Sequence, residues 1–327
     1  MPAGNLYGSH LDSRDIVADF YPRLESAMET IWAPAVAALI PSDREVEELK
    51  WLGQVPAMRK WIGGRAEEVL NKYSLTVQNV PYEATLAMSV DDLRRDKTGQ
   101  LRTRIGDLAL RTATHWNSLI GTLITNGEAG TSGLAYDGQY FFDTDHNESG
   151  TSQTNDLTAT EVPAANVSTA SVLTSTEAAD VITQTIGYMM TLTDDKGELI
   201  NQGATDVVIL CTKVVHFNGL NNAINLNNLS TGTDNNPVQA IRARGFNIRV
   251  EFVPSRITAA DKLYFFFGNP GMGSTPLIRT EEQGVQTQLI GAGSEEEFKN
   301  KRHLFGVNSN RGVAYGMWQK AALVTLS

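Results

Sequence analysis

The sequence predicts an α+β fold, because helix and strand patterns follow one another without the regular order of βαβ units. Three observations carry this prediction: a long one-sided helix over residues 98–126, a strand pair over 69–89, and separate apolar strands in the second half. Along the helix the inward-facing positions recur at steps of three or four residues, namely Leu101, Ile105, Leu108, Thr112, Trp116, Leu119 and Leu123. Arg102, Arg104 and Asp107 lie off this stripe, so one face packs and the other meets water.

The first 48 residues contain one amphipathic segment, over 16–31, which Asp12 or Ser13 could cap. An alanine-rich piece over 32–40 follows it. Because large apolar residues are few after the polar start, we expect an arm that lies on another surface, such as a neighbouring copy. Removing residues 1–30 should then leave the subunit folded.

A β-ribbon is predicted over 69–89, where Tyr73, Leu75 and Val77 alternate with polar residues and the chain after Asn79 remains rich in strand formers. We expect the turn of this ribbon near Asn79. An isolated two-stranded ribbon is marginal in water. It should therefore rest on a second surface, with basic side chains at its base.

A polar segment over 126–170 separates the long helix from the second half, and a loop of this length is usually functional. The later elements are predicted as a helix over 176–193, a short helix followed by an Asn-rich turn over 216–229, and strands over 206–211, 246–253, 263–267 and 314–326. Cys211 ends the first of these strands, where we expect a small buried hydrophobe rather than a nucleophile. As the single cysteine it excludes an internal disulfide and fits a reducing compartment.

The net charge of −10 argues against non-specific nucleic-acid binding by the whole surface. Residues 1–50 carry nine acids and four bases, whereas residues 51–111 carry seven acids and ten bases. These segments of opposite sign could meet each other or the matching segments of neighbouring copies, or they could simply be solvated surface. No apolar run approaches the roughly 18 residues of a membrane span, and the start has no secretory pattern, so we expect no membrane partner.

One loop offers candidate ligands for a metal, since Asp143, Asp145 and His146 stand close together in the sequence. A metal site needs three or four convergent ligands, and the same residues could form a turn held by aspartate side chains. A metal-dependent enzyme or ligand-binding protein that uses this loop is the alternative function, and an adhesin or tail component rich in Thr, Asn and Gly is a third. No phosphate-binding loop or nucleophile elbow occurs, so neither catalytic residues nor a cofactor are expected.

Three runs of residues carry a resemblance to a known family. They cover residues 52–65 (LGQVPAMRKWIGGR), 70–85 and 136–146 (YDGQYFFDTDH). These runs are similar to those of the major head subunits of Mu-like bacteriophages, which have the HK97-like capsid fold. The resemblance implies an N-arm over 1–48, an E-loop β-ribbon over 49–92, and a P-domain over 93–175 with a spine helix at about 98–126. It also implies an A-domain over 176–275 and a P-domain return strand over 276–327.

What the resemblance implies about function is a major capsid protein without catalysis, cofactor or metal. Such a subunit self-assembles into hexamers and pentamers of the icosahedral head shell that encloses the double-stranded DNA genome of a tailed phage. Its partners would be transient scaffold and protease proteins, a portal, and packaged DNA bound without sequence specificity, with a decoration protein as a further candidate. It would be made in the bacterial cytoplasm and reside in the virion, and we expect no N-terminal scaffolding segment to be removed.

Candidates for the assembly interface come from the resembling runs. They are Arg59, Trp61, Arg65, Lys72, Tyr73, Tyr82, Tyr136, Asp137, Phe141, Phe142, Asp143 and His146.

Overall fold

The computed structural model describes residues 13–52, 72–95, 100–148, 150–229, 235–253, 261–268 and 275–327. The helices are α1 (Ser13–Met28), α2 (Ala33–Val36), α3 (Val90–Arg95), α4 (Gln100–Thr125), α5 (Ser175–Met189), α6 (Val214–Asn225), α7 (Pro237–Ala243) and α8 (Glu295–Asn300). The strands are β1 (Ala37–Pro41), β2 (Val46–Leu52), β3 (Lys72–Gln78), β4 (Val80–Ser89), β5 (His146–Glu148), β6 (Thr151–Gln153), β7 (Asp156–Leu157), β8 (Asp206–Cys211), β9 (Asn247–Phe252), β10 (Lys262–Phe267), β11 (Leu277–Ile290), β12 (Arg302–Tyr315) and β13 (Ala321–Thr325). Across these ranges no helix is long and apolar enough to cross a membrane.

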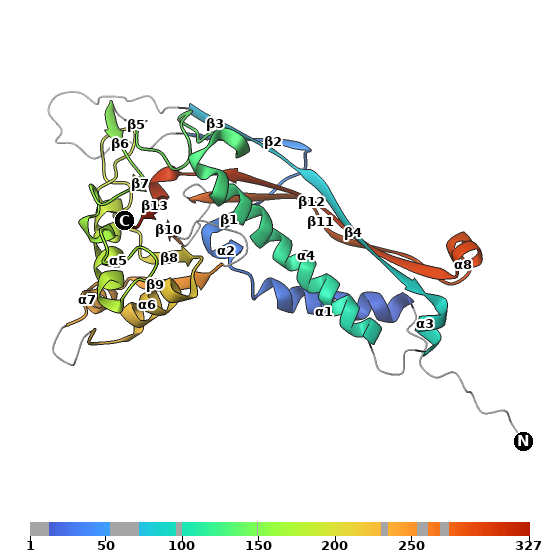
Figure 1. Cartoon of the computed structure of the whole chain (residues 1–327). Coiled ribbons are helices and arrows are strands. Elements are labelled where there is room, and N and C mark those ends of the chain that lie inside the picture. The colour runs from blue at the N-terminus through green and yellow to red at the C-terminus, as the bar shows by residue number, and fades with distance from the viewer. Residues whose placement is uncertain are drawn as a thin grey trace, which may run out of the picture.

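The molecule is elongated, as Figure 1 shows, with α4 running along a four-stranded sheet and the hairpin β11–β12 reaching α8 at one end. The order in this sheet is β1-β11-β12-β4. Strands β11 and β12 pair antiparallel, and β1 pairs parallel with β11. The sheet, α1 and α4 enclose one hydrophobic core.

The other end is a five-stranded sheet, β7-β13-β10-β8-β9, with α5, α6 and α7 beside it. Alternate side chains of β8, β10 and β13 enter different cores: Val208, Leu210 and Phe266 join the first, whereas Ile209 and Phe265 join a second core with α5 and α6. Because both faces of these strands are buried, their sequences are almost continuously apolar. The sheet is thus the wall between the two cores.

The N-terminal segment is part of the subunit core, so the expectation of an arm that needs a neighbour is wrong for residues 16–38. Ile16, Phe20 and Leu24 are buried against α4 and the first sheet. The Phe20 ring meets Phe305 of β12 edge-on, with centroids 5.5 Å apart. Four-residue spacing of these side chains gives α1 an apolar stripe, and α4 supplies its partner. Residues 1–12 lie outside the described ranges.

The predicted ribbon with a turn at Asn79 is also wrong. β3 pairs with β2, from Val46↔Gln78 to Leu52↔Lys72, whereas β4 pairs with β12. Asn79 joins β3 to β4 without reversing the chain: its side chain donates to the carbonyl of Arg44 and accepts from the hydroxyl of Thr280. A ribbon does exist, but it is β2–β3, and Asn79 is the buried point where the strand leaves it for the large sheet.

The C-terminal segment is divided between the two sheets, which the single assignment of residues 276–327 did not foresee. β11 and β12 lie in the four-stranded sheet, while β13 pairs with β10 in the five-stranded sheet. The predicted strand over 314–326 is broken by a short 3-10 helix at Trp318–Lys320. The helices predicted over 16–31, 98–126, 176–193 and 216–229 are confirmed as α1, α4, α5 and α6.

Replacing Phe20 by alanine should lower the free energy of unfolding by about 3–5 kcal/mol, because a fully buried ring is lost between α1 and β12. Urea unfolding of the unassembled subunit measures this change. Glu25→Ala on the exposed face of the same helix is the control and should stay within about 0.5 kcal/mol of the parent. Unchanged stability in F20A would mean that α1 does not dock on α4 and β12. Deletion of residues 1–30 removes the whole of α1 and should unfold the subunit.

The start of α5 predicts an acid-sensitive contribution to stability. Thr174 caps the helix and Glu177 completes a capping box. Burial raises the pKa of Glu177, but hydrogen bonds from Thr174 and Ser168 outweigh it and lower the pKa from 4.5 to about 2. A depressed folded-state pKa stabilises above the unfolded value and loses that effect as pH falls toward the folded one. The advantage of the parent over E177Q in urea unfolding should therefore be full above pH 5 and smaller at pH 3; an equal advantage at both values would contradict the assignment.

Candidate assembly surfaces

A tryptophan between two arginines joins α4 to the four-stranded sheet. Trp116 is 1% exposed, and the guanidinium carbons of Arg279 and Arg311 lie 5.1 Å and 4.6 Å from its ring centroid. Arg279 donates through Nε to the carbonyl of Ala37 on β1, and Arg311 donates through Nη1 to the carbonyl of Thr112 on α4. These contacts connect α4 with β1, β11 and β12.

The electrostatic balance at this junction is positive. Burial lowers the pKa of Arg279 to about 10 and also lowers the pKa of Arg311, so both remain cationic at neutral pH. The carboxylate of Glu281 is 3.5 Å from Arg311 Nε. Among the described residues, Arg311 Nη2 is buried without a hydrogen-bond partner. Two buried guanidinium groups thus share one carboxylate.

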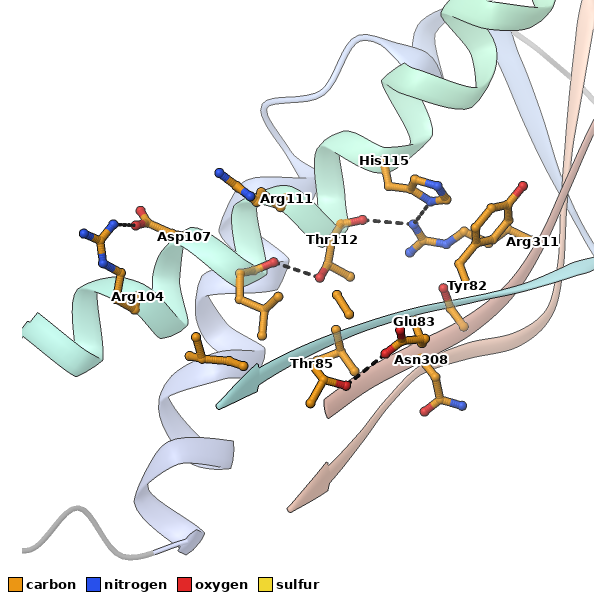
Figure 2. A pocket seen from close by; sticks show the side chains of 15 residues that line it. Tyr82, Glu83, Thr85, Arg104, Asp107, Arg111, Thr112, His115, Asn308 and Arg311 are labelled. Carbon is orange, nitrogen blue, oxygen red and sulfur yellow. Dashed lines mark hydrogen bonds and ion pairs between the residues drawn. The ribbon is translucent and has the colours of Figure 1, made fainter. Parts of the chain in front are cut away.

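A cavity of about 460 Å³ opens beside Arg311, between α4 and the strands β4 and β12. Figure 2 shows the guanidinium of Arg311 beside His115, and Arg104 and Arg111 on α4. Leu86, Leu108 and Val307 are among its apolar lining residues. The cavity therefore combines apolar walls with three arginines and with two carboxylates, those of Glu83 and Asp107, of which Asp107 pairs with Arg104.

The long polar segment after α4 is held by a buried amide. Asn155 is fully buried and donates to the carbonyls of Phe141 and Trp318, while its own oxygen accepts from the amide of Asp143. His146 pairs through Nδ1 with Asp137 at 2.6 Å, and its ring stacks on Trp318 with centroids 4.0 Å apart. This loop is ordered by contacts with the C-terminal segment of its own subunit.

The interface candidates therefore divide into groups. Phe141, Phe142 and His146 are buried inside the subunit, which corrects their assignment as contact residues: they build the loop. Tyr136, Asp137 and Asp143 are half-buried on that loop. Half-buried Tyr82 lines the cavity and meets the ring of His115 edge-on, with centroids 4.4 Å apart. Lys72 and Tyr73 lie on β3, and the remaining three, Arg59, Trp61 and Arg65, lie outside the described ranges.

The alternative of a metal-dependent site has no convergent ligand set. The carboxylate of Asp143 accepts from the amides of Tyr140 and Thr144, and the ring of His146 is engaged by Asp137 and Trp318. A hydrogen bond with Asp143 raises the pKa of exposed Asp145. In the described part of the chain, no three His, Cys, Asp or Glu residues gather where they could hold a metal ion. Cys211 is buried and burial raises its pKa to about 12, as expected for a packing residue.

One exposed apolar residue was missed by the sequence analysis. Phe298 of α8 is 88% exposed at the tip of the β11–β12 hairpin. Ion pairs of Glu295 with Lys299 and of Glu296 with Arg302 fix this short helix. The sequence does indicate this exposure, because Phe298 lies in an acidic segment and no apolar residue stands three or four positions away to pack against it.

The comparisons with known proteins can now be set against this geometry. Residues 17–179 match the family described as "Mu-like prophage major head subunit gpT". The major head subunit of the Mu-like prophage FluMu of Haemophilus influenzae is 30% identical over 122 residues, which are 36% of this chain and 39% of that protein. The major capsid protein of Escherichia phage Mu is 27% identical over 111 residues, 34% of this chain and 35% of that protein. The aligned part thus spans well under two thirds of either relative.

Solved structures extend the likeness of fold to nearly the whole chain. The capsid of bacteriophage JBD30 matches with a TM-score of 0.50 and 14% identity, covering 90% of this chain and 64% of that one. The virus-like particle from Pyrococcus furiosus matches with a TM-score of 0.51 and 9% identity, covering 95% and 98%. The fold is therefore the HK97-like capsid fold. By sequence and fold together, the chain belongs to the family of Mu-like prophage major head subunits, a family of structural proteins rather than enzymes.

Proposed function

We propose that the chain is a major capsid protein that self-assembles into the icosahedral head shell around the double-stranded DNA genome of a tailed phage. Family membership and the HK97-like fold support this function. The single observation on the subunit itself that carries it is Phe298, a large aromatic side chain left almost wholly in water.

Phe298 lies on a short helix that is already folded in the lone subunit. The α8 turn is capped by Ser294, whose hydroxyl accepts from the amide of Glu297, and ion pairs join Glu295 to Lys299 and Glu296 to Arg302 of β12. An exposed phenylalanine contributes nothing to folding of the lone subunit. Aromatic side chains presented on a rigid element are typical centres of protein–protein interfaces. The hairpin tip thus fits self-association, in which its partner is another copy.

The domains are proposed to correspond to those of other subunits of this fold, with adjusted limits. The four-stranded sheet with α4 would be the P-domain, and α1 would belong to it rather than to a free arm. The five-stranded sheet with α5, α6, α7 and β13 would be the A-domain. The β2–β3 ribbon would be the base of the E-loop.

The partners proposed for the chain follow from the shell. Copies would form hexamers and pentamers, with a portal and transient scaffold and protease proteins as partners and a decoration protein as a further candidate. The net charge of −10 lets packed DNA lie inside without tight binding to the wall. The protein would be made in the host cytoplasm and reside in the virion. Tyr82, Tyr136 and Asp143, which are partly exposed, remain proposed contact residues. The side chain of Asp137 is only 8% exposed and pairs with His146.

Replacing Phe298 by serine should leave the melting temperature of the subunit within about 2 °C of the parent and reduce shell yield at least about tenfold. Electron microscopy and sedimentation measure the yield. F298L is the matched variant, since it keeps an apolar side chain and should retain most of the assembly. Parent protein that remains monomeric would refute the shell function, whereas normal shells from F298S would refute only the role of the hairpin tip.

A further inference from the structure

We propose that the cavity between α4 and strands β4 and β12 receives the acidic segment of residues 43–48 from a second copy of this chain. The proposal rests on the shell function and adds a pair of contacting surfaces to it.

The lining of the receiving surface holds three arginines against two carboxylates, those of Glu83 and Asp107, and Asp107 already pairs with Arg104. Arg311 is 1% exposed, and its Nη2 atom is buried without a hydrogen-bond partner in the described part of the chain. The nearby carboxylate of Glu281 already faces both Arg311 and Arg279. Arg111 of α4 is an exposed cation among the lining residues. Buried charges are normally paired, so this arrangement favours a carboxylate that arrives from outside.

The entering segment has the matching character. Residues 43–48 hold four carboxylates and one arginine. Asp43 and Glu48 have side chains that are 90% and 53% exposed, and Val46 is a 49% exposed apolar residue between them. Val46 and Glu48 lie two residues apart on β2, so they point to the same side of the strand. An apolar group beside a carboxylate fits apolar walls beside an arginine.

The segment cannot come from the same subunit. Asn79 holds this turn to its own sheet by donating to the side chain of Ser42 and the carbonyl of Arg44. None of residues 43–48 lines the cavity of its own chain. The two surfaces lie at different places on one subunit, so their contact would be head-to-tail, the type that closes into rings. It would also join the acidic first segment of the sequence to the basic one that follows.

Charge reversal tests this pairing. R111E and E45R/E48R should each raise the subunit concentration needed for assembly about tenfold or more, because like charges would then meet. The combined chain R111E/E45R/E48R should assemble within about threefold of the parent. R102E is the matched control, since it makes the same change on the exposed face of α4 away from the cavity and should assemble normally. Light scattering at a series of concentrations measures all four against the parent.

The variants report separately on the cavity contact and on the shell function. Assembly by the parent and R102E reports on the shell function alone. Normal assembly by R111E would overturn the cavity contact. Failure of R111E without rescue by the acidic reversals would overturn residues 43–48 as the occupant. Melting temperatures of the unassembled variants, expected within about 2 °C of the parent because both sites are exposed, exclude loss of folding as the cause.

Discussion

The contact on which the structure depends is Trp116 between Arg279 and Arg311. It lies where α4 crosses the four-stranded sheet, and each arginine also hydrogen-bonds a main-chain carbonyl of a different element. Guanidinium groups can be buried here because both lie over an aromatic ring and Glu281 lies near Arg311. The same contact leaves an excess positive charge next to a cavity. The junction that holds the subunit together therefore also prepares a surface for another molecule.

The two faces of the five-stranded sheet pack against different cores. One face completes the core of α1, α4 and the first sheet, and the other face is covered by α5 and α6. The C-terminal strand β13 and the loop pinned by Asn155 both join at this wall. Consequently the α4 half and the α5–α7 half are linked by a shared layer rather than by a linker. The β2–β3 ribbon and the α8 tip are among the described elements that lie outside these two cores, and they are well placed to reach neighbours.

Local sequence patterns were sufficient to predict the long helices and the apolar strands. α4 follows from its period, although the buried stripe includes Ala109 and Ala113, whose small side chains carry no strong hydrophobic signal. β11 and β12 escaped prediction because their polar residues form strands only when paired with each other and with distant β1 and β4. The burial of His146 could not be read from its loop, since Trp318 arrives from the C-terminal segment. Phe141 and Phe142 were predicted as interface residues, but both are buried and pack inside the subunit.

The most direct test of the junction is a double-mutant cycle on Trp116 and Arg311. W116L, R311M and the double variant are compared with the parent by urea unfolding of the unassembled subunit. If the indole stabilises the buried guanidinium, the coupling free energy should be about 1–2 kcal/mol. Effects that add to within about 0.3 kcal/mol would contradict it and would mean that the two side chains only fill adjacent space.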